Sequence, residues 1–580
     1  MTKLHFCRLG SLFLAIIFIG CDTDYLDRAP EDELDAEFFF NTAKDLEVAT
    51  NDFYTMFSGK DEYSDDSASD NVVQLTPAAR VRGSRLVPTE RGSGGWSWGR
   101  LRDINYFLEN YRKVEDEEAK LHYSGIARFF RAYFYFHKVK TFGDVPWYGK
   151  VLKAGDPDLY KARDSRELVM DSVLTDINYA VTHIPATKEL NKITKYTAFL
   201  LKARIALFEG TFRKYHGISG YEKFLNEAVS AADELMNSGA YSLFSTGGPH
   251  AAYRNLFSRD NQDHVETILA QDFDRELETH NLGYLMTAPT MGAWGLPKDL
   301  VNSYLMKDGT RFTDIPNYET IEFYEEMQNR DPRLTQSTAG PDFMVNGENM
   351  AEPVILSGTT TGYRVIKALP SKDQWNTAHF DIILFRYAEA LLIYAEAKAE
   401  LGSITQSDLD RSINLLRDRV NMPHLKLVDA NANPDMFLEN MYPNVSQGQN
   451  KGVILEIRRE RRIELFNEGL RWDDLMRWKA GKKIEQPMVG IYFPSLGATD
   501  FNNDGISDVY LHDGNASGAP STVTSLINVN QRPLTNGTSG NLDPFSTGGV
   551  FDESKDYYSP IPLEDLALNS NLTQNPGWDD

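Results

Sequence analysis

The stretch LFRYAEALLIYAEAKAELG, residues 384–402, decides the fold. Its apolar and small side chains recur every three or four residues, at Leu384, Tyr387, Ala388, Leu391, Leu392, Ala395 and Ala399. This spacing predicts an α-helix with one packed face. Gly402 ends the helix, and residues 408–420 predict a partner helix beside it. The stretch therefore begins a helical hairpin.

Three further helical pairs are predicted on the N-terminal side of this hairpin. Residues 126–139 pair with 166–184, residues 195–208 with 221–236, and, on a weaker pattern, residues 42–57 with 99–111. Alanines on the facing sides of the second pair allow close approach, and we expect Gly210 and Gly239 to lie at its helix ends. Repeated hairpins with alanine and tyrosine at their contacts are typical of tetratricopeptide-like stacking. The predicted fold class is mainly α, a tetratricopeptide-like helical hairpin scaffold.

Two long insertions interrupt the expected repeats. Residues 240–380 and 485–555 are rich in Gly, Asn, Thr and Pro, and we expect them to form loops with minor β structure. No Pro- or Ser-rich linker divides the chain. We therefore expect one unit over residues 21–580, with helical repeats at about 35–240 and 381–480. Loops of this length are usually functional or mobile.

The first residues, MTKLHFCRLGSLFLAIIFIGC, have the layout of an export signal. Lys3 and Arg8 precede a short apolar core, which is too short to span a bilayer as a mature helix. A cysteine after a small residue resembles a bacterial lipoprotein signal, although Phe18 replaces the usual leucine. We expect residues 1–20 to be removed and Cys21 to carry lipid. An ordinary secretion signal is the alternative.

Composition excludes some classes of protein. The net charge of −24 makes the chain repel phosphate backbones, which argues against a nucleic-acid partner. Cys7 and Cys21 are the only cysteines in the sequence, so the mature chain has no disulfide and packing alone must stabilise it.

Several segments, in the same order along the chain, resemble the SusD/RagB family of outer-membrane nutrient-binding lipoproteins. The resemblance covers nearly the whole mature chain. The segments are residues 21–57, ARFFRAYFYFHKVKTFGDVPW (127–147), MKDGTRF (306–312), RDPRL (330–334), 384–402, INLLRDRVNMP (413–423), IRRERRIELFNEGLRWDDLMRW (457–478) and YYSPIPLEDLALNSNLTQNPGW (557–578).

The resemblance implies a lipid-anchored protein exposed at the cell surface on the outer membrane. Such a protein acts as a lid on a SusC-like TonB-dependent transporter, captures oligosaccharide or polysaccharide, and has no catalytic activity. Some members of the family capture peptides instead, and that alternative stays open.

The predicted ligand site consists of aromatic side chains in loops. A sugar ring has an apolar C–H face that suits an aromatic ring, and nearby amides and carboxylates can bind its hydroxyls. The candidates are Trp96, Trp294, Trp375 and Tyr284, with Asp70 and Asn376 as polar partners. The alternative for each tryptophan is that its ring packs its own loop against the core. We expect Trp98, at the start of a helix, to be a core residue.

Residues 500–508, DFNNDGISD, resemble a calcium loop. Asp500, Asn502, Asp504, Ile506 and Asp508 occupy alternate ligand positions, and Gly505 stands at the turn. The acid expected at position 12 is absent, because Leu511 stands there. A simple Asn/Asp/Gly turn is the alternative. A bound calcium ion would stiffen the loop, and no other cofactor is expected.

The segment 457–478 is dense in charge, but its apolar residues recur at helical spacing. We expect Arg462, Arg471 and Arg477 to pair with Glu464, Asp473 and Asp474 near the core. No metalloprotease, serine-hydrolase or Walker signature occurs in the sequence. A helical glycosidase stays open, because a catalytic carboxylate pair is defined by its separation in space. A structural subunit that binds only protein is a further alternative.

Overall fold

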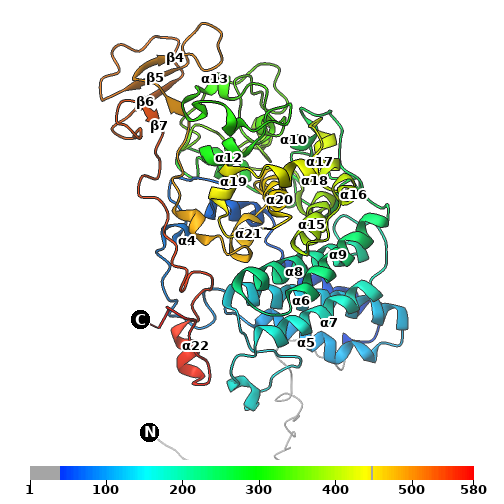
Figure 1. The fold of residues 1–580 in the computed structure, drawn as a ribbon. Helices are drawn as coiled ribbons and strands as arrows, with labels where there is room; N and C mark the ends of the chain where they lie inside the picture. The colour runs from blue at the N-terminus through cyan, green and yellow to red at the C-terminus, as the bar shows by residue number, and fades with distance from the viewer. Residues whose placement is uncertain (1–38, 446–447, 580) are drawn as a thin grey trace, which may run out of the picture.

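The computed structural model describes residues 39–445 and 448–579, and this part of the chain is mainly helical (Figure 1). The predicted mainly α class is confirmed. The predicted signal and Cys21 lie outside the described residues. Among the described residues, every helix is too short or too polar to cross a bilayer.

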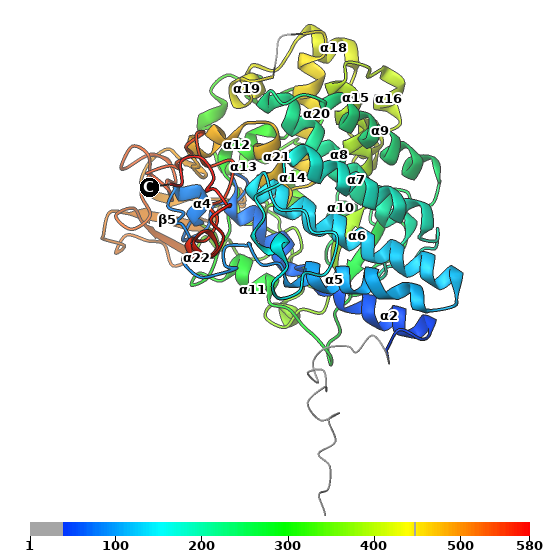
Figure 2. The ribbon, with the colours of Figure 1, turned by 90° about the horizontal axis from the view of Figure 1, so that it is seen from below.

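Paired helices stack along one flank of the molecule, and Figure 2 shows them following one another from α2 to α16. Helix α6 packs against α7, α8 packs against α9, and α15 packs against both α9 and α20. Helices α2 and α5 both pack on α6. This is the predicted tetratricopeptide-like scaffold. The bounds are α2 (Ala43–Asn51), α5 (Gly99–Asn110), α6 (Glu117–Phe142), α7 (Arg166–His183), α8 (Lys195–His216), α9 (Tyr221–Asn237), α15 (Tyr387–Glu400), α16 (Gln406–Asp410), α17 (Ile413–Arg419) and α20 (Lys451–Glu464).

Gly210 does not end its helix, contrary to the expectation. Helix α8 continues to His216 and ends at Gly217, whose φ of +73° is the left-handed conformation of a helix C-terminus. A Cβ atom at Gly210 would lie 2.8 Å from the Leu225 side chain on α9. The missing side chain therefore allows α8 and α9 to approach closely.

The helix predicted over residues 408–420 is broken into α16 and α17. Thr405 caps α16 in a reciprocal arrangement with Asp408. Ser412 then leaves the helical region, with φ −136° and ψ −92°. Its hydroxyl donates to the Asp408 carbonyl, a local bond that competes with the helix ladder.

The insertion 240–380 folds into short helices against the scaffold. Strands β1 (Thr267–Gln271) and β2 (Ile382–Arg386) pair antiparallel and bring Thr267 next to Arg386, directly before α15. The short helices of the insertion are α10 (Ala252–Leu256), α11 (Leu282–Thr287), α12 (Lys298–Ser303), α13 (Phe323–Glu326) and α14 (Leu334–Ser337).

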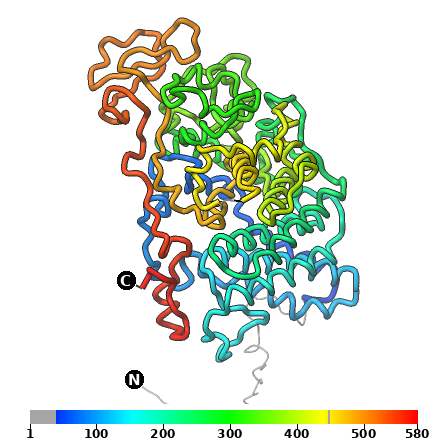
Figure 3. The backbone as a smooth tube through the Cα atoms, viewed as in Figure 1, coloured from blue at the N-terminus to red at the C-terminus, as the bar shows by residue number. Residues whose placement is uncertain are grey.

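The second insertion carries most of the remaining strands (upper left in Figure 1). β4 and β5 form an antiparallel hairpin, β5 pairs parallel with β6, and β3 pairs antiparallel with β7. The chain then descends along one flank to α22 (Figure 3). The strands are β3 (Tyr492–Phe493), β4 (Gly497–Thr499), β5 (Val509–His512), β6 (Ser525–Asn528) and β7 (Gly540–Asn541). The remaining helices are α3 (Lys60–Ser64), α4 (Ala79–Arg82), α18 (Leu427–Ala432), α19 (Met436–Met441), α21 (Arg471–Arg477) and α22 (Leu563–Leu568).

Two large hydrophobic cores meet at the end of α20. The first core lies among the stacked helices and includes Leu455 and Leu465. The second lies under the two insertions and includes Ile463 and Phe466. Glu464 therefore stands at the boundary between the cores, where the insertions join the scaffold.

Candidate functional site

Trp375 and Tyr284 come together on the surface of the insertion 240–380. The Trp375 side chain is 40% exposed. Its ring meets the half-buried Tyr284 ring edge-on, with centroids 5.0 Å apart and planes at 75°. Its Nε1 donates to the Thr287 hydroxyl over 2.8 Å. Tyr284 and Thr287 both lie on α11, so one short helix fixes the ring from two directions.

Hydrogen bonds of the residues on either side of Trp375 fix the loop that carries it. The Gln374 side chain donates to Asp260 over 2.7 Å and accepts the backbone N–H of His379 over 3.1 Å. The backbones of His280 and Ala378 exchange hydrogen bonds of 2.8 and 2.7 Å. Asn376, the next residue along the chain, is exposed. The geometry is a partly exposed aromatic ring on a preorganised support, followed in the chain by an exposed amide side chain.

Trp294 is not exposed. Its side chain is 3% exposed and packs in the second core. The backbone around it forms bridges, since the Trp294 carbonyl accepts the N–H of Val365 over 3.2 Å and Gly295 pairs with Val73. The expectation that this ring faces a ligand is wrong. Its loop-like sequence context did not reveal that the loop is buried under its neighbours.

Asp70 is also buried, at 1% exposure, and it is a core ion-pair residue. Arg471 Nε and Nη2 donate to its two carboxylate oxygens over 2.7 and 2.8 Å, and Arg462 lies 3.2 Å away. Burial alone would raise the pKa of Asp70, but Arg471 and Arg462 outweigh it and hold the pKa well below its ordinary value. The expected role of Asp70 as a polar partner for a sugar is therefore wrong.

Trp96 is 2% exposed, and its role in ligand binding stays a prediction, because its side chain lines a cavity. Its ring packs edge-on against Trp98 at 5.3 Å and Phe142 at 4.8 Å. Trp96 does line a cavity of about 620 Å³, which α5, the segment 146–160 and α22 enclose. Trp98, expected in the core, is half-buried and lines the same cavity, edge-on to Tyr148 at 5.5 Å.

Three polar side chains of this cavity, those of Asn105, Asp565 and Asn569, are bonded to the backbone around it. Asn105 donates to the carbonyls of Tyr148 and Lys150 over 2.9 and 3.2 Å. Asp565 accepts the N–H of Gly92 over 2.8 Å, and Asn569 donates to the Lys161 carbonyl over 2.9 Å. Leucines occupy much of the remaining lining. These three polar groups are therefore already engaged in hydrogen bonds with the protein and are not free for a ligand.

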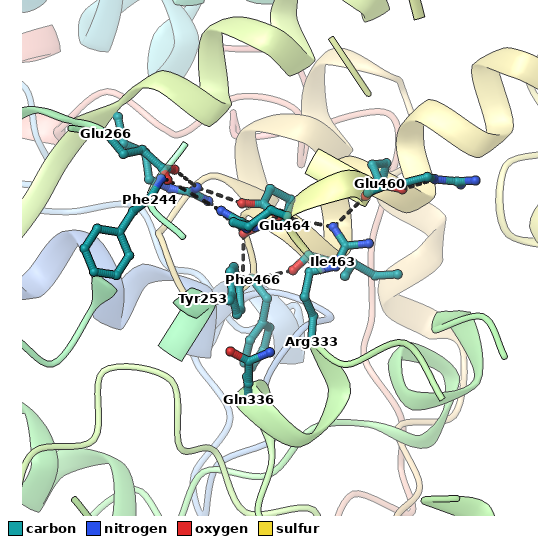
Figure 4. Close-up of polar contacts among 12 residues, drawn as sticks. Phe244, Tyr253, Glu266, Arg333, Gln336, Glu460, Ile463, Glu464 and Phe466 are labelled. Atoms are coloured by element: carbon teal, nitrogen blue, oxygen red, sulfur yellow. Dashed lines mark hydrogen bonds and ion pairs between the residues drawn. The ribbon is translucent and has the colours of Figure 1, made fainter. Parts of the chain in front are cut away.

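The charged segment 457–478 is structural, as predicted. Glu464 is fully buried and accepts hydrogen bonds from Arg386 at 2.7 Å, Arg419 at 2.6 Å and Arg333 at 3.1 Å (Figure 4). Burial raises the pKa of a carboxyl group, but these three guanidinium groups outweigh it and hold the pKa of Glu464 well below its ordinary value. Glu266, Glu460 and Glu468 balance the arginines.

Two of the three predicted arginine pairings are wrong in detail. Arg462 and Arg471 bind Asp70, which lies about 390 to 400 positions away in sequence. Arg477 does bind Asp474 as expected, and also Glu396. Asp473 pairs with Lys140 on α6 instead. Sequence spacing predicted the burial of the charges, but it carries no signal for partners so far apart along the chain.

Residues 500–508 form the turn between β4 and β5. Asp500 accepts the backbone N–H groups of Asn503 at 2.7 Å and Gly505 at 2.8 Å, and Asp508 accepts that of Phe501 at 2.9 Å. Within residues 39–445 and 448–579, no group of three His, Cys, Asp or Glu is placed to hold a metal ion. The loop geometry is that of an Asx-rich turn. Calcium binding by Asp500, Asn502, Asp504, Ile506 and Asp508 stays a prediction.

Burial raises the pKa of five carboxyl groups among the described residues, those of Asp66, Asp103, Asp381, Asp508 and Asp543. The two with the largest shifts, Asp66 and Asp381, are buried. Burial raises the pKa of Asp66 to about 7 and that of Asp381 to about 6. Both accept backbone N–H groups, Asp66 from Asn467 and Asp381 from Gln262. A general acid must reach its substrate, so these two groups do not support the glycosidase alternative.

Fold and surface together define a helical-repeat protein that carries a preorganised aromatic ring on an insertion. A family model described as "SusD family" matches residues 240–578, and one described as "Starch-binding associating with outer membrane" matches residues 40–200. The chain belongs to the SusD family.

Relatives and solved structures agree with this family. SusD-like protein P38 of Formosa agariphila is 25% identical over 84% of this chain and 94% of its own length. SusD-like protein P2 of the same organism is 24% identical over 98% of this chain and 99% of its own. A SusD-like protein from Bacteroides fragilis shares the fold with a TM-score of 0.69 at 21% identity, over 95% of this chain and 100% of that one. A SusD-like carbohydrate binding protein from the same species gives 0.68 at 20% identity, over 92% and 100%.

Proposed function

We propose that this protein is a cell-surface lipoprotein that binds glycans, captures oligosaccharides and delivers them to a SusC-like TonB-dependent outer-membrane transporter. It binds its cargo without cleaving it. Membership of the SusD family supports the binding role, and the matched description "Starch-binding associating with outer membrane" supports the location. Lipid on Cys21 would hold the protein to the membrane.

The observation that carries the binding proposal is the Trp375 ring. An indole with an exposed face offers a negative π surface to the C–H groups of a sugar. The hydrogen bond to Thr287 and the edge contact with Tyr284 fix the ring before a ligand arrives. Little side-chain entropy is then lost on binding. Asn376 is exposed directly after Trp375 in the chain, and its amide can bind sugar hydroxyls.

A glycan panel tests this proposal with purified mature protein and matched variants. Trp375→Ala should weaken binding of a retained oligosaccharide by at least about fivefold, because one stacked ring contributes about 1 kcal/mol beyond the contact area it buries. Tyr160→Ala removes another exposed aromatic ring, on the rim of the 620 Å³ cavity, and should change nothing. A panel that includes peptides separates the cargo classes: retention of peptides alone would refute glycan capture.

The transporter partner is tested separately. Native outer membranes solubilised in mild detergent should yield a complex of the tagged protein with a TonB-dependent transporter. Recovery of the protein alone, from membranes in which it still binds glycan, would refute delivery but not capture.

A further inference from the structure

A second pocket, of about 360 Å³, lies between the segment 320–325 and the start of the C-terminal insertion. The two walls are far apart in sequence and belong to different insertions. The pocket shares no lining residue with the 620 Å³ cavity, and Trp375 is not part of it. Its lining is Thr320, Ile321, Glu322, Phe323, Tyr324, Glu325, Tyr492, Thr499, Asp500, Phe501 and Asn503.

The floor of this pocket is rigid and aromatic. Phe323 stacks on Phe501 with centroids 4.8 Å apart and planes at 26°. Phe501 also contacts Phe493 at 5.8 Å, and all three rings are buried in the second core. The carboxylates of Asp508 and Asp500 hold the backbone that carries Phe501. The walls therefore keep their shape without a ligand.

The rim of this pocket is polar, and four of its side chains are free to bind a ligand, whereas Asp500 and Thr320 are bonded to the backbone. Tyr324 and Tyr492 are half-buried, and Glu322 and Glu325 are exposed. Among residues 39–445 and 448–579, these four side chains have no hydrogen-bond or ion-pair partner. The 620 Å³ cavity differs in this respect, because its asparagines and Asp565 are bonded to its own walls.

We propose that this pocket binds a neutral, hydroxyl-rich sugar unit, as a second glycan contact separate from Trp375. The tyrosine rings offer C–H-compatible faces, and the carboxylates and phenol groups can bind sugar hydroxyls. The volume falls within the usual range of ligand pockets. The inference rests on the proposed function, since it assumes that glycan reaches this protein.

Charge narrows the class of sugar. Glu322, Glu325 and Asp500 line the pocket, and no lysine or arginine of the described part of the chain does. Like charges that face each other without compensation disfavour binding. The pocket should therefore reject sulfated and uronic sugars. Two contacts on one chain would also let a polymer bind more tightly than an oligosaccharide that reaches only one of them.

Fluorine NMR of the mature chain labelled with 3-fluorotyrosine tests the site directly. Tyr324→Phe and Tyr492→Phe assign the two resonances. The probes are the methyl glycosides of glucose, galactose, mannose and xylose, and the charged control is methyl glucuronide. We expect at least one neutral glycoside to shift both resonances, and methyl glucuronide to shift neither. No shift with any neutral glycoside, or an equal shift with the glucuronide, would overturn the proposal.

Variants separate this site from the proposed function. Trp375→Ala should leave the two shifts intact, and loss of the shifts in that variant would overturn the claim of a separate site. Tyr492→Ala should weaken retention on a neutral polysaccharide by about two- to tenfold. It should not change binding of a short oligosaccharide at Trp375. If Trp375→Ala has no effect on any glycan while the tyrosine shifts persist, the proposed primary site fails and the second site stands.

Discussion

Replacing Glu464 by glutamine should be among the most destabilising single changes in this protein. The substitution keeps the shape of the side chain but removes the negative charge that three arginines share. At 4 Å and an effective dielectric constant of about 20, one ion pair is worth about 4 kcal/mol. Desolvation cancels much of that sum, and breaking a buried pair costs about 3–5 kcal/mol in net stability.

Urea unfolding followed by tryptophan fluorescence measures this loss. The midpoint should fall with little change in slope, because the surface exposed on unfolding is unchanged. Glu325→Gln is the matched control: Glu325 is exposed and unpaired, so the free energy of unfolding should change by less than about 0.5 kcal/mol. A loss of less than about 1 kcal/mol in Glu464→Gln would refute the reasoning.

The pH dependence of this loss gives a second check. The pKa of Glu464 is lowered in the folded state, so its contribution to stability is present above its unfolded pKa of about 4.3. That contribution decreases as the pH falls toward the folded-state pKa, by up to about 1.4 kcal/mol per pH unit. The difference between the native protein and Glu464→Gln should therefore shrink below about pH 4.3. A constant difference across that range would contradict the assigned charge state.

Four further predictions follow from the same contacts. Thr287→Val should weaken glycan binding less than Trp375→Ala does in the same titration, because it frees the indole without removing it; an equal loss would mean that Thr287 contacts the ligand itself. Gly210→Ala should lower the free energy of unfolding by about 1–3 kcal/mol, because the new Cβ would crowd Leu225. Gly99→Ala, which has open space around its Cβ, should leave the free energy of unfolding unchanged in the same experiment. Equal effects of the two changes would contradict the close α8–α9 contact. Burial lowers the pKa of His280 to about 4, so its neutral form stabilises the fold above pH 6.5 and that stability is lost as the pH falls toward 4. Because His280 pairs with Ala378 near Trp375, glycan binding at about pH 3.5 should be weaker than at pH 7. Binding that does not change between these pH values would count against this link. If the 500–508 loop binds calcium, calcium at 100 times its dissociation constant should stabilise the protein by about 2.7 kcal/mol. Asp504→Asn should remove that gain. Identical unfolding curves in calcium and in chelator would contradict the calcium prediction.

Local sequence patterns predicted the helices well, because apolar spacing reports which face is buried whatever that face packs against. Local spacing alone was enough to predict the helix over residues 384–402 and the helix pair within residues 126–184. The same patterns failed at Gly210 and Ser412. At position 210 a glycine is needed inside the helix because a side chain would collide with Leu225 on the next helix. At Ser412 the helix breaks where the serine hydroxyl bonds locally to the Asp408 carbonyl. Glycine inside a helix and glycine at its end look alike in sequence.

The candidate site was less predictable, because exposure of a loop residue depends on what covers the loop. Trp294 and Trp375 both stand in loop-like sequence contexts, yet the structure buries one and exposes the other. The Asp70–Arg471 pair and the pocket between residues 320–325 and 492–503 join segments too distant for any local pattern to connect. Tyrosines 324 and 492 gave no signal of their own, since neither stands in a distinctive motif.

A crystal structure of the mature chain with an oligosaccharide that it retains from a glycan panel tests the central claim most directly. The account predicts a sugar ring stacked on Trp375, within reach of Asn376, with every glycosidic bond intact. A glycan bound elsewhere while the Trp375 face stays in solvent, or a cleaved product in its place, would contradict it.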